Sequence, residues 1–320
     1  MLRTFIRLAI TYMGLAALTY SGAFAESFMR SHDFVLGTNM DLVIVTDTES
    51  TADQVEAAIL SEIERLNTIL STYDANSEVS LLNTKTIATV SSDLFAVLAA
   101  CEAFRTQTEN ALSCRIGDLL NTWQSGEDAG KVPSRAKLRI AAGEIRRANL
   151  NLDKDTLTLE RPDAVLFQMN ALAKGYIIDR ALDAARATSA DLDGILINIG
   201  GDIRTWGESP ADGTWTATIR AARSETGAGV QLALSDGALA TSGRGPRDRE
   251  IDGKSFSHII SPKNGWHVEG ISQASVFASD SMTADALATA LLVMPLSDGI
   301  AFVESKSAIE ARIVADDGRA

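Results

Sequence analysis

The chain has 320 residues and carries 42 acidic against 29 basic side chains, which gives a net charge of −13 at pH 7. Such an acidic protein is a poor nucleic-acid binder, and a phosphate-rich ligand would need a metal ion or local cations. With 46% hydrophobic residues, the chain is long enough to bury a large core.

The first 25 residues have the pattern of a secretory signal peptide. Arg3 and Arg7 precede an apolar run over residues 8–20, and Ala23-Phe24-Ala25 follows as a small-x-small cleavage site. The alternative is an uncleaved membrane anchor, but the apolar run is short for a membrane span. We therefore expect cleavage after Ala25 and a periplasmic protein. Cleavage would take the net charge to −15, because it removes two arginines and no acidic residue.

Helical patterns dominate the first half of the mature chain. Residues 33–46 alternate between polar and apolar and predict a strand, whereas residues 53–70 carry apolar side chains at the helical period. Further helices are predicted at 92–106 and 134–148, with an exposed polar loop at 124–133 between them.

Strand patterns dominate the second half. Short strands at 150–166 are joined by a turn at Asp153-Lys154-Asp155, and a helix at 170–187 follows. Further strands are predicted at 195–199, 214–221, 229–234, 239–241, 256–260 and 274–278, before helices resume at Thr283. Since neighbouring segments supply most of the sheets, we expect an α+β fold with mixed or antiparallel sheets and flanking helices in two lobes. No linker interrupts the pattern, so residues 26–320 are expected to form a single domain.

Cys101 and Cys114 are the only cysteines. In an exported protein they could form a disulfide that closes a short loop. Cys101 lies in an apolar helical run, so a buried free thiol is an equal alternative. The three histidines, His32, His258 and His267, are scattered, which argues against a histidine-based metal site.

The segment that starts at Ser281 predicts the first turns of a helix with two oxygen donors on one face. Asp285 and Thr289 are four residues apart, and the rest of that face is small and apolar. A hard cation with few protein ligands, usually Mg²⁺, suits such a pair when substrate phosphates supply further oxygens. Taken alone, the pair is more often a helix cap or part of a solvated face.

Further motifs accompany this helix in a fixed order. They lie at residues 36–38, 70–73, 77–79, 82–83, 173–179, 197–202, 240–243 and 257–262. Their order and spacing resemble the ApbE family of periplasmic flavin transferases, which move FMN from FAD onto a protein. The resemblance runs from about residue 34 to residue 295, and it implies the fold and chemistry of that family.

The resemblance implies that Mg²⁺ is held by Asp285, Thr289 and the main-chain carbonyl of Ala171. It also implies that His258 is the general base that takes the proton from an attacking Ser or Thr hydroxyl. From the residues alone, His258 could equally be a half-buried strand histidine bonded to a backbone carbonyl.

The resemblance also predicts the residues that contact FAD. These are Leu36, Tyr73, Ala111, Leu112, Ser113, Gln168, Lys174 and Ile259. The turn at residues 200–202, Gly-Gly-Asp, matches the one that lines the flavin site in the family, although alone it would predict only a hairpin. A tyrosine at position 73 is typical of members that transfer FMN rather than hydrolyse FAD.

The chain departs from the family pattern at several positions. Gln168 and Ser261 stand where the family usually has acids, and Ala171 stands where it has glycine. Residues 112–115 read Leu-Ser-Cys-Arg in place of Phe-Asp-Pro-Thr. Arg115 could therefore bind a phosphate bidentately, or it could pair with a surface acid.

The expected function is Mg²⁺-dependent transfer of FMN from FAD to a Ser or Thr hydroxyl of an exported acceptor protein, with release of AMP. The acceptor can be membrane-associated, and no nucleic-acid partner is expected. The alternatives are an exported FAD-binding protein without transfer activity and a pyrophosphatase that splits FAD into FMN and AMP. The retained Asp285, Thr289 and His258 favour an enzyme, and Tyr73 favours transfer over hydrolysis.

Overall fold

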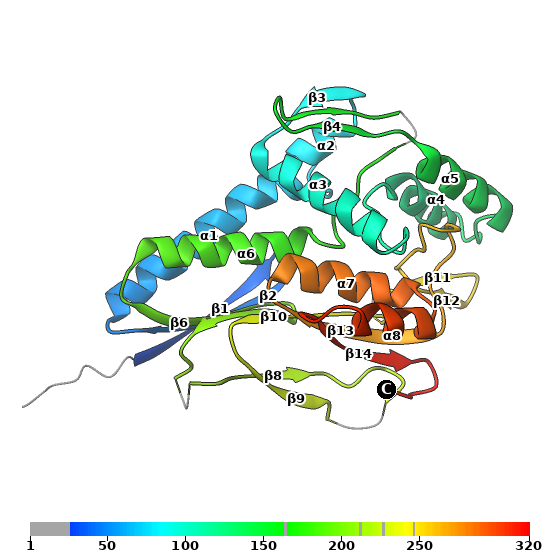
Figure 1. The fold of residues 1–320 in the computed structure, drawn as a ribbon. Helices are drawn as coiled ribbons and strands as arrows, with labels where there is room; N and C mark the ends of the chain where they lie inside the picture. Colours follow the sequence, from blue (N-terminus) through cyan, green and yellow to red (C-terminus); the bar gives the residue numbers. More distant parts are fainter. Residues whose placement is uncertain (1–25, 163–164, 211–212, 226–227, 246) are drawn as a thin grey trace, which may run out of the picture.

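A seven-stranded antiparallel sheet organises the fold in the computed structural model, which describes residues 26–162, 165–210, 213–225, 228–245 and 247–320 (Figure 1). The predicted signal peptide, residues 1–25, lies outside the described residues. The strands in spatial order are β1 (Glu26–Val35), β2 (Thr38–Thr46), β6 (Leu192–Ile199), β7 (Asp202–Gly207), β10 (Gly237–Gly243), β13 (Ile271–Ala278) and β14 (Glu310–Ala315).

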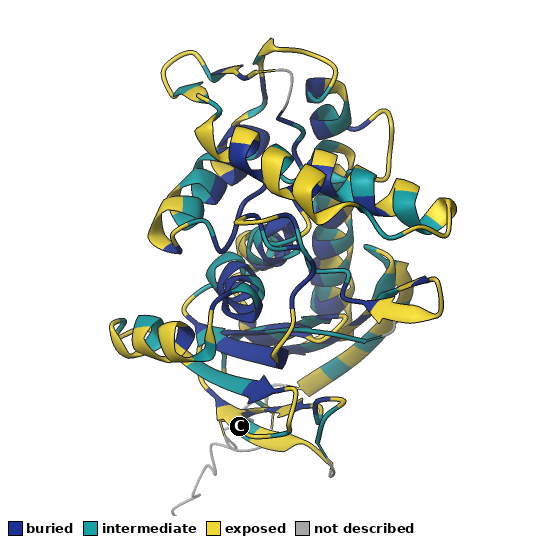
Figure 2. Cartoon of the chain, turned by 90° about the vertical axis from the view of Figure 1, so that its right-hand side faces the viewer, coloured by how far each residue is buried: buried dark blue, intermediate teal, exposed yellow. Residues whose placement is uncertain are grey.

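Helices from distant parts of the chain cover one face of this sheet (Figure 1). They are α1 (Glu49–Leu70), α6 (Ala173–Thr188) and α7 (Ser281–Val293). The buried residues of α1 recur at the helical period, from Val55 through Ile59 and Ile63 to Leu66, so one stripe faces the core. Figure 2 shows the same division, with buried residues toward the sheet and exposed residues outside. Among the described residues, no helix is long and apolar enough to cross a membrane.

A second lobe stands above these helices (Figure 1). It contains α2 (Glu78–Leu82), α3 (Ser92–Gln107), α4 (Gly117–Asp128), α5 (Arg135–Arg147) and the small sheet of β3 (Ile87–Thr89), β5 (Thr158–Glu160) and β4 (Asn151–Asp153). The main hydrophobic core runs without a break from the large sheet through α1, α6 and α7 into α3. The two lobes therefore share one core, which agrees with the α+β fold in two lobes predicted from the sequence.

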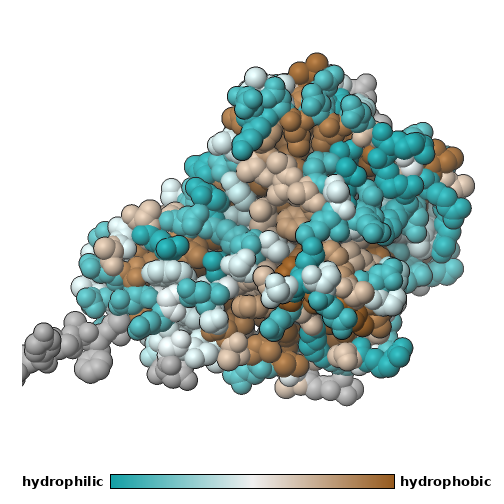
Figure 3. Space-filling view, in the orientation of Figure 1, coloured by the Kyte–Doolittle hydropathy of each residue, from teal (hydrophilic) through white to brown (hydrophobic). Residues whose placement is uncertain are grey.

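Two hairpins and a short helix complete the structure. β8 (Trp215–Ile219) and β9 (Val230–Leu234) pack on the other face of the large sheet. β11 (Arg249–Ile251) and β12 (Lys254–Phe256) pack against α4 and α5, and α8 (Leu296–Glu304) precedes β14. In the view of Figure 3 the surface is mostly hydrophilic, and apolar residues reach it in separate places.

Three sequence predictions for secondary structure were wrong. The single strand predicted at residues 33–46 is the end of β1 and the whole of β2, which are joined by a turn at residues 36 and 37. Residues 124–128 belong to α4 rather than to a loop, because Leu119 and Trp123 bury one face of that helix while its polar residues face outward. The strand predicted at 256–260 ends at Phe256, and only Ile260 forms an isolated bridge, with His267.

Candidate functional site

The N-terminal ends of α6 and α7 meet at the centre of the candidate site. A Cβ at Gly175 would clash with the backbone carbonyl of Ser281, so only glycine lets the two helices approach this closely. The Gly175 N–H donates to Asp285 Oδ2 at 3.1 Å. In return, Asp179 accepts from the N–H groups of Ser281 (2.8 Å) and Met282 (2.9 Å). Each helix thus supplies a carboxylate to the unpaired amides at the other's N-terminus.

An ion pair between a partly buried lysine and a buried aspartate lies beside this junction. Lys174 Nζ is 2.7 Å from Asp202 Oδ2, and Asp202 begins β7 directly after the Gly200-Gly201 turn. Burial lowers the pKa of Lys174, but the charges of Asp202 and Asp285 outweigh this and raise it overall, so the ammonium stays charged. The motif around Lys174 and the glycine turn are therefore brought together.

Asp285 and Thr289 occupy one face of α7, as predicted. Thr289 Oγ1 lies 3.1 Å from Ser242 Oγ on β10. Burial, and then the neighbouring charge of Asp202, raises the pKa of Asp285 to about 8, although Lys174 and the Gly175 N–H oppose this. A second cation close to Asp285 would favour its ionised form.

This donor set fits a hard divalent cation. Among the described residues, no three His, Cys, Asp or Glu side chains form a metal-binding group. A cation at Asp285 would therefore depend on one carboxylate, the Thr289 hydroxyl and the main-chain carbonyl of Ala171, with the remaining ligands from water or substrate. Ala171 lies half-buried in the turn just before α6. Its role as a metal ligand stays a prediction.

The glycine turn also contacts the first residues of β2, just after the turn between β1 and β2. The Gly200 N–H donates to the Asn39 carbonyl at 3.0 Å, and a Cβ at Gly200 would lie 2.7 Å from Thr38 Cγ2. Leu36, a predicted FAD contact, is half-buried in this turn with a φ of 49°. Two motifs about 160 residues apart in sequence therefore border the same part of the sheet edge.

The segment around Tyr73 lies against the segment before α6. Thr72 Oγ1 donates to Gln168 Oε1 at 2.5 Å, and Asn170 Nδ2 donates to the Tyr73 hydroxyl at 2.9 Å. Tyr73 is 85% exposed. Gln168 thus serves as an acceptor for Thr72 at the position where the family pattern has an acid.

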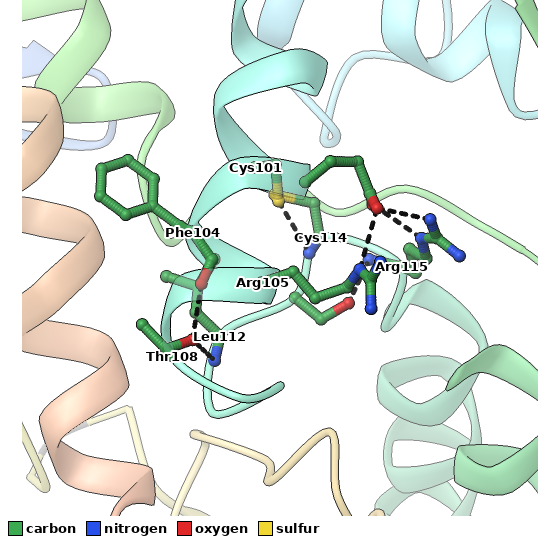
Figure 4. The surroundings of a disulfide bond; sticks show 9 residues. Cys101, Phe104, Arg105, Thr108, Leu112, Cys114 and Arg115 are labelled. Atoms are coloured by element: carbon green, nitrogen blue, oxygen red, sulfur yellow. Dashed lines mark hydrogen bonds and ion pairs between the residues drawn. A yellow bond between two sulfur atoms is a disulfide. The ribbon is translucent and has the colours of Figure 1, made fainter. Parts of the chain in front are cut away.

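A disulfide joins Cys101 on α3 to Cys114, with 6.1 Å between the Cα atoms (Figure 4). The free-thiol alternative is therefore wrong. The bond fixes the segment that contains Ala111, Leu112 and Ser113, all buried. Cys114 in turn accepts from the Gln168 N–H at 2.7 Å. Contact of these residues with FAD stays a prediction.

Arg115 does not face a phosphate site. Its Nε donates to Glu102 Oε1 at 2.7 Å, its Nη1 donates to the Ala148 carbonyl at 2.7 Å, and the residue is only 3% exposed. Arg115 pairs with an acid, Glu102, as the alternative of a surface acid predicted, but the pair is largely buried rather than on the surface. The guanidinium therefore holds the disulfide segment against α3.

His258 follows the β11–β12 hairpin and is paired with a carboxylate that the sequence analysis missed. Its Nδ1 lies 3.0 Å from Asp248 Oδ1, so the alternative of a strand histidine bonded to a backbone carbonyl is wrong. Burial lowers the pKa of His258 below its usual value, while Asp248 opposes the shift. The Asp252-Gly253 turn was the available signal, because such a two-residue hairpin places residues 247–248 opposite residues 257–258.

The histidine and the helix junction border a common region. Arg247 acts electrostatically on His258, Lys174 and Asp285 alike. Ile259, the remaining predicted FAD contact, is half-buried beside His258 and packs against the main core. Arg247 is thus close to both the predicted base and the predicted metal ligand Asp285.

Comparisons with known proteins identify the family and the relatives of this chain. The model of the ApbE family matches residues 36–313. The FAD:protein FMN transferase of Haemophilus influenzae is 30% identical over 263 residues, covering 78% of this chain and 74% of that protein. The Vibrio cholerae transferase is 31% identical over 265 residues, covering 80% and 78%.

Solved structures give the same family. The ApbE protein of Thermotoga maritima has a TM-score of 0.81 at 26% identity, covering 92% of this chain and 96% of that one. The flavin transferase ApbE of Vibrio cholerae has a TM-score of 0.76 at 26% identity, with the same coverage.

The raised pKa of Asp285 makes a pH-dependent prediction for stability. Between about pH 4 and pH 8 the unfolded chain ionises Asp285 while the folded, metal-free protein keeps it protonated, so stability is lost as pH rises through this window. Asp285→Asn removes this term. The measurement is urea unfolding in the presence of EDTA. From pH 4 to pH 8 the free energy of unfolding of the variant should rise relative to that of wild type, and above pH 8 the difference should stay constant. A difference that does not change with pH would contradict the burial of an ionisable carboxylate here.

Proposed function

The chain belongs to the ApbE family, and we propose that it carries out Mg²⁺-dependent transfer of FMN from FAD to a Ser or Thr hydroxyl of an acceptor protein, with release of AMP. That the chain is an enzyme that transfers flavin from FAD to a protein follows from the family and from relatives named FAD:protein FMN transferase. The observation that supports the Mg²⁺-dependent reaction is the buried Asp285 carboxylate, which lies beside Lys174 and one turn from Thr289.

Asp285, Thr289 and the Ala171 carbonyl would hold Mg²⁺, which when bound supplies positive charge that stabilises a reacting diphosphate. Lys174 adds a fixed ammonium to the same place and is itself oriented by Asp202. The Gly175 N–H holds the Asp285 carboxylate through Oδ2. These residues bind and orient FAD rather than exchange protons with it, as is usual in phosphoryl transfer.

His258 would take the proton. The acceptor hydroxyl oxygen bonds to the phosphorus of the FMN half, and the bond from that phosphorus to the bridging oxygen breaks. The electron pair leaves with AMP, and the hydroxyl proton goes to the imidazole. Because burial lowers the pKa of His258, the ring is neutral and able to accept a proton near pH 7.

The two alternative functions, FAD hydrolysis and FAD binding without transfer, would use the same site and give different products. Water in place of the acceptor hydroxyl would give FMN and AMP, and a site that only binds would leave FAD intact. The exposed Tyr73 ring, next to Asn170 in the segment that precedes α6, suits a site open to a second macromolecule. We therefore favour transfer.

The direct test incubates purified protein with FAD, Mg²⁺ and a Thr-containing acceptor, followed by intact mass of the acceptor. Wild type should add one FMN. His258→Ala should keep FAD bound and slow transfer by roughly 10²–10⁴-fold, as expected for a lost general base. Asp285→Ala should weaken FAD retention and abolish transfer.

The same assay separates the alternatives. Free FMN and AMP without acceptor labelling would identify a pyrophosphatase. Firmly bound, intact FAD with a cognate acceptor present would identify a binding protein. Equal labelling by wild type and His258→Ala would exclude His258 as the base.

We also propose that residues 26–320 act as one exported domain in the periplasm, where a membrane-associated acceptor can be reached. The signal-peptide pattern at residues 1–25 and the Cys101–Cys114 disulfide support export, because disulfides persist in oxidising compartments. Protein recovered from the periplasmic fraction should begin at Glu26 in N-terminal sequencing and carry no free thiol. Retention of Met1 would contradict cleavage.

A further inference from the structure

We propose that Asp248 is a positioning residue for His258, which it holds in one ring orientation and one tautomer so that Nε2 is the proton acceptor. The inference rests on the proposed function, since it assigns a role within that reaction. It begins from a contact between two residues ten positions apart, on opposite sides of the β11–β12 hairpin.

One oxygen of Asp248 binds His258 twice. Asp248 Oδ1 is 3.0 Å from the ring Nδ1 and 3.2 Å from the backbone nitrogen of the same residue. Because backbone and ring are bound to the same atom, rotation of the ring about its side-chain bonds would break one of the two contacts. The arrangement fixes the direction of the ring as well as its distance.

The hairpin makes this contact a property of the fold. Asp252 and Gly253 both have positive φ, 52° and 68°, as a tight two-residue hairpin turn requires. The turn sets the register Arg249 opposite Phe256, so Asp248 and His258 flank the open end of the hairpin. Phe256 anchors that end in the core formed with α4 and α5.

Neighbouring groups secure the same end. Arg249 Nη1 donates to the His258 carbonyl at 3.4 Å, and its Nε lies 3.5 Å from Glu127 Oε2 on α4. The Asp248 side chain is only 5% exposed, so few water molecules compete for its oxygens. Its contact with His258 is therefore stronger than an exposed pair would be.

The chemistry follows from what a carboxylate can do. An ionised carboxylate only accepts hydrogen bonds, so Nδ1 must carry the hydrogen and Nε2 the lone pair. When Nε2 receives the acceptor's proton, the resulting imidazolium is stabilised by the adjacent negative charge. This is the role that the aspartate has in a Ser-His-Asp triad.

The test compares Asp248→Asn with a matched control, Asp252→Asn, which removes the same charge from the exposed tip of the same hairpin. Asparagine also tolerates the positive φ at that turn. Asp248→Asn should lower the rate of acceptor labelling roughly 10- to 10³-fold at saturating FAD and acceptor, with FAD affinity unchanged. Asp252→Asn should match wild type. Asp248→Glu, which restores the carboxylate, should regain part of the rate.

A second readout does not depend on turnover. The chain has three histidines, so ¹⁵N-histidine NMR with His258→Ala as the assignment control can identify the His258 signals. Wild type should show the Nδ1–H tautomer, and Asp248→Asn should show it diminished. Labelling by Asp248→Asn within about twofold of wild type, an unchanged tautomer, or equal loss in both variants would overturn the assignment. An FAD-loaded wild type that never labels an acceptor would instead overturn the proposed function, and this assignment with it.

Discussion

The candidate site depends on the exchange of carboxylates between the N-terminal ends of α6 and α7. Asp179 on α6 binds the first amides of α7, and Asp285 on α7 binds the Gly175 amide of α6. The exchange is possible only because residue 175 has no side chain to meet Ser281. It satisfies helix-end amides that would otherwise be unpaired, and it carries Asp285 into the protein interior beside Lys174.

This placement indicates how an acidic protein would bind an anionic dinucleotide under the proposed function. Burial and the charge of Asp202 disfavour the ionised form of Asp285, and the charges of Lys174 and Arg247 do not fully offset them. Lys174 is itself paired with Asp202, so its charge is not enough to favour the ionised form of Asp285. A divalent cation beside Asp285 would favour the ionised carboxylate, and FAD phosphates would complete the coordination of that cation. Metal and dinucleotide should therefore bind together.

The sequence predicts those parts of the site that local spacing controls, and it fails where distant segments must meet. The common face of Asp285 and Thr289 follows from helical periodicity alone. The Cys101–Cys114 bond, the Arg115–Glu102 pair and the Asp248–His258 contact needed the fold, because each joins residues about ten or more positions apart. Ser261, where the family pattern has an acid, accepts an amide hydrogen bond within its own turn, and the carboxylate beside His258 comes from the hairpin instead.

The most direct test of this account is calorimetric titration of FAD into wild type and Thr289→Val, each with Mg²⁺ and with EDTA. If Asp285 and Thr289 hold a cation shared with the diphosphate, Mg²⁺ should strengthen FAD binding by wild type clearly more than by the variant. By reciprocity, FAD should strengthen Mg²⁺ binding by the same factor. Equal FAD affinity for wild type in Mg²⁺ and in EDTA would contradict the account.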